Sequence, residues 1–230
     1  KEQLKSQMAE MGLKPTDTVL IHTSLRAIGP VENGADGVID AFCEYLSDGL
    51  FIVPTHTWGN LGKEITLDMT DPATCLGAFS DLAAADGRGI RSENPTHSMA
   101  VFGDREKALR FIADEPFVTA GTAPESCYGK LCEWGGYVLL IGVAHNRNTY
   151  LHCVDEMLGV PNRISAEPRE VTVKRATGEV VKRMLHTHFT DYTPDMEQRY
   201  RAMAKELGLV LSGGTDYHGA NKPHISIGKG

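Results

Sequence analysis

A histidine and two carboxylates in the segment 148–156 have the residue types and the spacing of a general-base site. The segment reads Asn-Thr-Tyr-Leu-His-Cys-Val-Asp-Glu and follows an apolar run over 137–143. An apolar run that ends in glycine and small polar residues is typical of a buried strand leading into a helix. Residues three and four apart in that helix share a face, so Thr149, His152 and the pair Asp155/Glu156 would form one stripe. A carboxylate one turn from a histidine orients the ring and stabilises its protonated form, which makes the ring a stronger base.

Two other interpretations of this segment stay open on spacing alone. The first is an ordinary exposed helix whose histidine and carboxylates have no role in chemistry. The second uses Cys153, next to His152, as a nucleophile activated by the histidine. Adjacent helix residues point about 100° apart, so we favour a buried structural cysteine.

The elements that must position these residues alternate between apolar strands and amphipathic helices. The predicted strands are 18–22, 50–53 and 138–143, and the predicted helices include 1–11, 34–46 and 104–111. This alternation is typical of an α/β fold with a mainly parallel central sheet flanked by helices. Ligands of such sheets bind at the carboxyl ends of the strands. The polar stretches that follow strands are 23–24, 55–57 and 146–152.

The later part of the chain has a different pattern. Residues 170–175 and 179–184 alternate between faces across the turn Ala176-Thr177-Gly178, which predicts a β-hairpin insertion near residues 170–184. Beyond it, residues 196–207 have helical spacing and residues 208–212 are typical of a strand.

Composition restricts the class of protein and its partners. The 230 residues are 41% hydrophobic and 23% charged with a net charge of -7, which is ordinary for a globular enzyme. An acidic surface argues against nucleic acid and suits a small cationic substrate. No apolar run approaches the roughly 20 residues of a membrane helix, and no signal-peptide pattern is found. The five cysteines are scattered without Cys-x-x-Cys spacing, which indicates a reducing, cytoplasmic location without a disulfide framework or zinc knuckle.

Five short segments, in order, resemble the aminoglycoside 3-N-acetyltransferase family, the antibiotic acetyltransferases outside the GNAT fold. They are His22-Thr23-Ser24-Leu25 with Ile28-Gly29; Val53-Pro54-Thr55; Arg91-Ser92 with Pro95-Thr96-His97-Ser98 and Gly103; Pro124 with Gly129-Lys130-Leu131; and the run 139–143 leading to Asn148-Thr149-x-Leu151-His152. Each segment is short, but their common order is specific. The match covers about residues 1–189.

The resemblance implies a reaction and a set of site residues. The reaction is acetyl transfer from acetyl-CoA, as cosubstrate and with no metal expected, to an amine of the deoxystreptamine ring of an aminoglycoside. His152 corresponds to the catalytic base of the family. The family usually has glutamate three residues after this histidine; this chain has Asp155 there and Glu156 next, so either carboxylate could orient the ring.

The remaining site residues follow from the same resemblance. The expected coenzyme A contacts are Thr23, Ser24, Leu25, Ser98, Met99 and Thr149. The expected substrate contacts are Trp58, His97, Glu125 and His188. Asn94 stands where the family often has histidine, and Glu125-Ser126-Cys127 replaces its usual turn. These departures leave the acceptor open, so an N-acyltransferase for a different amine is the first alternative.

The C-terminal segment resembles a different family. Residues 200–230 are similar to the end of a PHP-type metallophosphoesterase, in which an Asp-x-His such as Asp216-x-His218 supplies metal ligands. A hydrolytic metal cluster needs several more ligands and an open position, and the rest of a PHP domain is absent from the sequence. We therefore expect an acetyltransferase-like core over 1–189 and a segment 190–230 that packs on it or is appended to it. A metal-dependent phosphoesterase is the less favoured alternative.

Overall fold

The structure is a computed structural model that describes residues 1–161, 163–188, 198, 201–202 and 205–206. The chain divides into two compact units, Lys1–Thr187 and His188–Gly230. Both β-sheets lie in the first unit.

The larger of two sheets has five strands in the order β4-β5-β2-β1-β6. Their bounds are β1 Thr18–Thr23, β2 Leu50–Pro54, β4 Ile90–Arg91, β5 Met99–Gly103 and β6 Tyr137–Ile141. β1 runs parallel to its neighbours β2 and β6, whereas β5 runs antiparallel to β2 and β4. The predicted α/β fold with a central sheet is confirmed. The sheet is mixed in direction because β5 runs antiparallel to its two neighbours, and neither β4 nor β5 was predicted.

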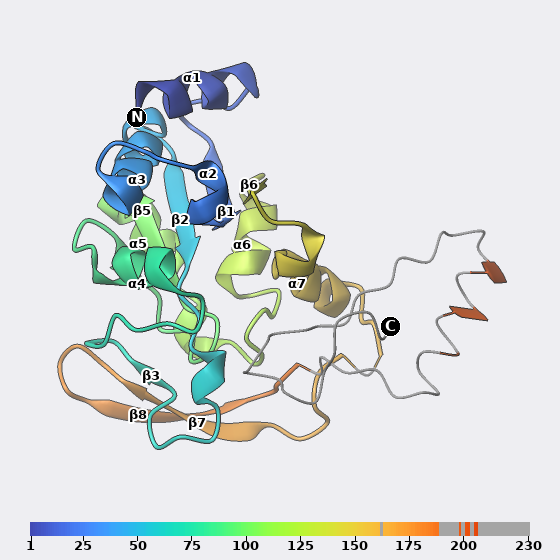
Figure 1. Cartoon of the computed structure of the whole chain (residues 1–230). Helices are drawn as coiled ribbons and strands as arrows, with labels where there is room; N and C mark the ends of the chain where they lie inside the picture. The colour runs from blue at the N-terminus through green and yellow to red at the C-terminus, as the bar shows by residue number, and fades with distance from the viewer. Residues whose placement is uncertain (162, 189–197, 199–200, 203–204, 207–230) are drawn as a thin grey trace. The chain divides into compact units, whose positions relative to one another are not determined.

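Helices flank this sheet on both faces (Figure 1). The α-helices are α1 Glu2–Glu10, α2 Leu25–Ile28, α3 Gly34–Tyr45, α4 Ala78–Ala85, α5 Arg105–Phe111, α6 Cys127–Glu133 and α7 Tyr150–Met157. Three 3₁₀ helices, η1 Trp58–Asn60, η2 Glu115–Phe117 and η3 His145–Arg147, lie between them. None of the helices in the described residues is long and apolar enough to cross a membrane.

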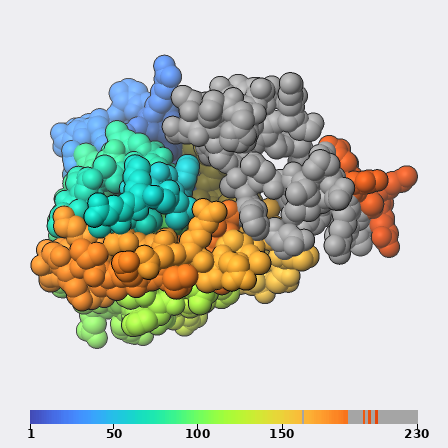
Figure 2. Space-filling model, turned by 90° about the horizontal axis from the view of Figure 1, so that it is seen from below, coloured from blue at the N-terminus to red at the C-terminus, as the bar shows by residue number. Residues whose placement is uncertain are grey.

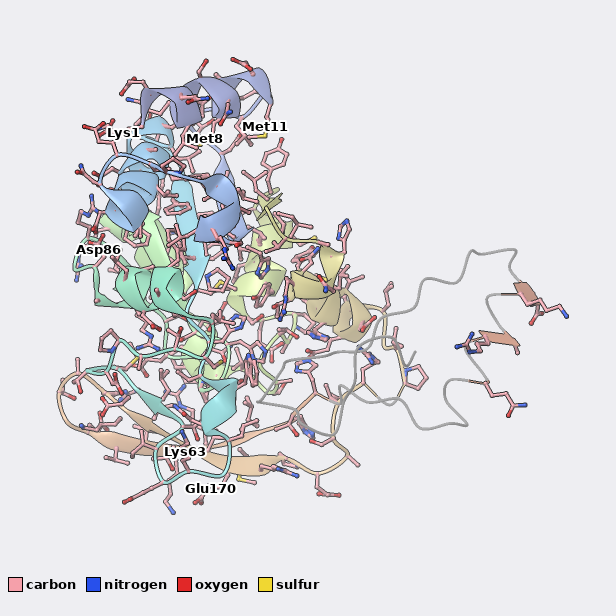
Figure 3. All side chains as sticks on the ribbon, viewed as in Figure 1. Lys1, Met8, Met11, Lys63, Asp86 and Glu170 are labelled. Atoms are coloured by element: carbon pink, nitrogen blue, oxygen red, sulfur yellow. The ribbon has the colours of Figure 1, made fainter. Side chains whose placement is uncertain are left out.

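The two faces of the sheet follow from strand alternation. Successive residues of a strand point to opposite faces. In β1, Val19 and Ile21 pack with α1, α3 and α4, whereas Leu20 packs with α5, α6 and α7. Figure 3 labels Met8 of α1, which is buried in the first layer, and Met11, which is 60% exposed just beyond the helix. The second layer, with α6 and α7, is the one that carries the predicted site.

The smaller sheet has three strands in the order β3-β7-β8. β3 is Leu67–Asp68, β7 is Arg169–Lys174 and β8 is Val180–Leu185. β7 and β8 are antiparallel partners, which confirms the predicted hairpin, and β3 adds to β7 in parallel. Figure 2 shows the orange hairpin beside the cyan segment that contains β3, and Figure 3 labels Lys63 and Glu170 at this sheet.

Ion pairs join this small sheet to the loop that precedes β5. The Glu93 carboxylate pairs with Arg183 at 2.8 Å and with Arg175 at 3.0 Å. Arg183 is also a donor to the Glu93 carbonyl. Because Glu93 lies in the loop that carries His97, the hairpin holds this loop in place.

Candidate active site

Three histidines from different elements gather at the carboxyl ends of the parallel strands. His22 is the fifth residue of β1, His56 follows the end of β2, and His152 lies in the first turn of α7. His22 alternates with Leu20 and so points to the face that α6 and α7 cover. The His56 ring interacts electrostatically with both His22 and His152. His56 is therefore a neighbour of the predicted base, and His22 is a neighbour of His56.

The rings of His22 and His56 are both buried and neutral. His22 is 9% exposed and His56 is 1% exposed. Burial lowers the pKa of His22 to about 4 and the pKa of His56 well below its ordinary value. Within the part of the chain that the structure describes, His22 Nε2 and Thr23 Oγ1 are the buried side-chain atoms that lack a hydrogen-bond partner. Unpaired buried polar atoms are uncommon in folded proteins.

The buried state of His22 predicts a pH-dependent stability. Its pKa is lower in the folded than in the unfolded chain, so the unfolded chain binds the proton first as the pH falls. The contribution of the neutral His22 ring to the free energy of unfolding is therefore complete above pH 6.5 and is lost as the pH falls toward 4. Between pH 7 and pH 5, urea unfolding should show that wild type loses about 2 kcal/mol more stability than His22→Asn.

The control for this comparison is His145→Asn, because His145 is exposed in η3. This variant should keep the pH dependence of the wild type. Equal pH dependence in His22→Asn and wild type would contradict a neutral buried ring at this position.

His56 is held by a tyrosine that the sequence did not single out. Its Nε2 lies 2.9 Å from the Tyr128 hydroxyl, and the same phenol hydrogen-bonds the side chain of Thr149. Tyr128 is fully buried in α6. The polar stretch 55–57 after β2 indicated His56 as a strand-end residue, whereas nothing local distinguishes Tyr128 from an apolar core position.

His97 approaches the same cluster from the loop before β5. Its ring centroid is 4.7 Å from that of His56, and its Nδ1 lies 2.9 Å from Thr96 Oγ1. Asn94 builds this loop: its Oδ1 accepts from the backbone N–H groups of Thr96 and His97, and its side-chain amide donates to the Gly121 carbonyl. The asparagine that departs from the family pattern thus positions His97.

The two carboxylates that follow His152 have different partners. The Asp155 carboxylate forms an ion pair with Arg163 at 2.8 Å. Glu156 Oε1 accepts a hydrogen bond of 2.7 Å from the Thr122 hydroxyl. His152 itself is half-buried, and its backbone N–H donates to the Thr149 carbonyl at 3.0 Å.

Cys153 lies on the core side of α7. It is fully buried and packs with Tyr128 and Leu131. Burial raises the pKa of the thiol to about 12, so it stays protonated. The predicted burial of Cys153 is confirmed.

The predicted coenzyme contacts divide into two groups. Thr23, Ser24, Leu25 and Thr149 are half-buried at the strand-end edge, where the backbone N–H of Ser24 donates to the Ile141 carbonyl of β6. Ser98 and Met99 have no exposed surface. The Ser98 hydroxyl donates to the Thr55 carbonyl at 2.7 Å, and Met99 packs in the core of the sheet. The side chains of these last two residues hold the sheet together rather than line a surface.

The predicted substrate contacts are similarly spread. Trp58 is half-buried at the start of η1. Glu125 is half-buried, accepts from the backbone and hydroxyl of Thr119, and interacts electrostatically with Cys153 of α7. A polar cavity of about 280 Å³ lies beside Thr57, with Asp68 and Asp71 among its lining residues. His188 begins the second unit, so its relation to this site is not described.

The metal ligands predicted from the C-terminal resemblance, Asp216 and His218, lie outside the described residues. Most of the helix and the whole strand expected over 196–212 also lie outside them. In the residues that are described, no group of three or more His, Cys, Asp or Glu side chains could hold a metal ion.

The family model described as aminoglycoside 3-N-acetyltransferase matches residues 20–213. The match extends past residue 189, the predicted end of the acetyltransferase-like core. Aminoglycoside N(3)-acetyltransferase IV of Salmonella is 32% identical over 174 residues, which cover 75% of this chain and 64% of that protein. Aminoglycoside N(3)-acetyltransferase IX of Micromonospora chalcea is 29% identical over 183 residues, which cover 71% of this chain and 64% of that protein. The chain thus spans less than two thirds of the length of these relatives.

Solved structures show the same fold. The crystal structure of the aminoglycoside acetyltransferase AAC(3)-IVa apoenzyme has a TM-score of 0.67 and 28% identity, with 93% of this chain and 78% of that chain covered. A histidine-to-alanine variant of that protein in complex with a gentamicin has a TM-score of 0.66 and 29% identity, with 94% and 80% covered.

Proposed function

Because the chain belongs to the aminoglycoside 3-N-acetyltransferase family, we propose that it transfers the acetyl group of acetyl-CoA to the 3-amino group of an aminoglycoside. The single observation that carries this proposal is the position of His152. It lies in the first turn of α7, at the carboxyl ends of the parallel strands, with two carboxylates within one turn of it. The gentamicin complex of a relative at 29% identity supports the substrate class.

The proposed reaction begins with removal of a proton from the acceptor. An ammonium group has no free electron pair, so His152 must accept a proton before or during attack. The amine nitrogen then forms a bond to the thioester carbonyl carbon, the carbon–sulfur bond breaks, and coenzyme A leaves as the thiol after protonation. Hydroxyls at the strand ends, such as those of Thr23 and Ser24, would bind the pantetheine arm and the oxyanion.

The role of orienting carboxylate goes to Glu156 in this proposal. The Asp155 carboxylate is committed to the Arg163 guanidinium, whereas the Thr122 hydroxyl holds one oxygen of Glu156. A carboxylate that already binds another cation stabilises the protonated histidine less well, which argues against Asp155.

Glu156→Gln is therefore expected to lower kcat by about 10- to 100-fold, a part of the usual contribution of a general base. Asp155→Asn should change kcat by less than about threefold while it removes the ion pair to Arg163. Steady-state kinetics of the two variants side by side check this. A larger kcat loss in Asp155→Asn would assign the orienting role to Asp155.

The first alternative is an N-acyltransferase for an amine that is not an aminoglycoside. A panel of kanamycin-like and gentamicin-like drugs and simple amines separates the two, with NMR of the product to locate the acetyl group. We expect acetylation of the 3-amino group and a kcat/KM for the drugs far above that for simple amines. Equal kcat/KM for simple amines, or an acetyl group on another nitrogen, would overturn the proposal.

The second alternative, a metal-dependent phosphoesterase, depends on Asp216 and His218. It predicts activity that a chelator abolishes, whereas acetyl transfer by His152 needs no metal. We also propose that the protein acts in the cytoplasm on a small cationic substrate, without a nucleic-acid or membrane partner, in keeping with its net charge of -7.

A further inference from the structure

We propose that His56 and Tyr128 are positioning residues that fix the first turn of α7, and through it His152, by a buried chain of hydrogen bonds from Thr149. This inference rests on the proposed role of His152 in acetyl transfer. This chain of hydrogen bonds joins three separate elements: the loop after β2, helix α6 and the start of α7.

The hydrogen bonds of this chain can all be made with a neutral His56 ring. The phenol of Tyr128 has a single proton, and its oxygen lies 2.9 Å from His56 Nε2 and is bonded to the Thr149 side chain. His56 is neutral because it is buried, so one ring nitrogen is an acceptor. The Tyr128 hydroxyl can donate to that nitrogen while its oxygen accepts from the Thr149 hydroxyl. The Tyr128 hydroxyl then both donates and accepts, in an interior where an unpaired hydroxyl would be costly.

The Thr149 side chain ties the start of α7 to this chain of hydrogen bonds instead of capping the helix. Thr149 is the N-cap residue, but its own side chain does not cap the helix; Asn148 Oδ1 instead accepts from the Tyr150 backbone N–H at 3.2 Å. A threonine at this position usually accepts a hydrogen bond from the second or third backbone N–H. Here its hydroxyl is committed to Tyr128. A helix of eight residues is marginal by itself, so its first turn takes its position from Tyr128 and His56.

That turn contains the proposed base. The backbone N–H of His152 donates to the Thr149 carbonyl at 3.0 Å, so a shift of Thr149 moves His152 with it. His56 also lies close enough to His152 for the two rings to interact electrostatically. A neutral His56, held by the tyrosine hydroxyl, adds no positive charge beside a base that must become protonated.

The test is Tyr128→Phe, which removes one hydroxyl and keeps the buried ring. We expect kcat to fall by about 10- to 100-fold, because a catalytic group that is displaced by up to about one ångström lowers the rate by that much. The KM values for acetyl-CoA and for the drug should stay within about twofold of wild type, since the variant leaves the ligand contacts in place. Hydrogen exchange of residues 150–157, measured by mass spectrometry, should be faster.

A second variant, Thr149→Val, separates support of α7 from a direct contact with coenzyme A. It removes the other hydroxyl of the chain at equal size. A fall in kcat with unchanged KM for acetyl-CoA agrees with the proposal. A rise in that KM with unchanged kcat would instead make Thr149 a coenzyme contact and contradict it.

The matched control is Tyr45→Phe. The Tyr45 hydroxyl is half-buried and donates to the Leu13 carbonyl at 2.6 Å, in the layer on the opposite face of the sheet. Its loss should lower the melting temperature but leave kcat and the exchange of residues 150–157 unchanged. If Tyr128→Phe behaves like this control, with a lower melting temperature and normal kcat, the positioning role is wrong.

Hydrogen exchange keeps this inference separate from the proposed function. If wild type acetylates no drug, the proposed function fails; faster exchange of residues 150–157 in Tyr128→Phe would still support the hydrogen-bond chain as the anchor of α7. Unchanged exchange in that variant would overturn the anchor whatever the activity of the wild type.

Discussion

His152→Ala is expected to lower kcat by about 10²- to 10⁴-fold, the usual contribution of a general base. The acceptor amine arrives as an ammonium ion, and without the ring only water can take its proton. Affinity for acetyl-CoA should change little, because the ring faces the cluster with His22 and His56 and its removal leaves the strand-end hydroxyls in place. Thiol-release kinetics and calorimetric titration of coenzyme A give the two quantities.

His145→Ala is the control for this prediction. His145 is exposed in η3, a few residues before α7 on the same connection from β6. Its loss should leave kcat within about twofold, as is usual for a surface substitution away from the reacting groups. A His152→Ala variant with wild-type kcat would remove His152 from the reaction.

The second large effect is expected on stability. Glu115 is 1% exposed in η2, and its carboxylate accepts hydrogen bonds from the backbone N–H of Cys127 and, at 3.1 Å, from the Ser92 hydroxyl. It thereby joins the start of α6 to the loop before β5. Burial raises the pKa of this carboxyl. Glu115→Ala leaves two buried donors unpaired and should lower the free energy of unfolding by about 3 kcal/mol.

Urea unfolding at pH 7 measures this loss. Glu106→Ala is the matched control, because Glu106 is an exposed carboxylate in the first turn of α5; it should stay within about 0.5 kcal/mol of wild type. Glu115→Gln keeps the size and one acceptor oxygen, so it should fall between wild type and Glu115→Ala. A loss below about 1 kcal/mol in Glu115→Ala would mean that water or another group replaces the carboxylate.

Sequence patterns within single segments predicted the strands and helices that depend mainly on residues close together in the sequence. The apolar runs at 18–22, 50–53 and 138–143 became β1, β2 and β6 because both faces of a sheet covered by helices must be apolar. The hairpin near 170–184 was visible because its residues alternate and its turn contains glycine. β5 was missed: Met99–Gly103 is as long as β2 and β6, but it directly follows a polar loop.

The site could be predicted only where the chemistry lies in one segment. His152 and its two carboxylates lie in one short stretch, so helical spacing alone grouped them. Tyr128 and Glu115 form hydrogen bonds with residues far from them in the sequence, and such bonds leave no periodic pattern in the sequence. Ser98 was expected as a coenzyme contact from the family resemblance alone, and the sequence held no sign that its hydroxyl is buried and donates to the Thr55 carbonyl.

Acetyl transfer by His152 is best tested by release of coenzyme A thiol from acetyl-CoA by the purified chain with a gentamicin-like or kanamycin-like drug, with and without EDTA. We expect release that requires the drug, is unaffected by EDTA and is nearly abolished in His152→Ala. No drug-dependent release, or release that EDTA abolishes, would contradict it.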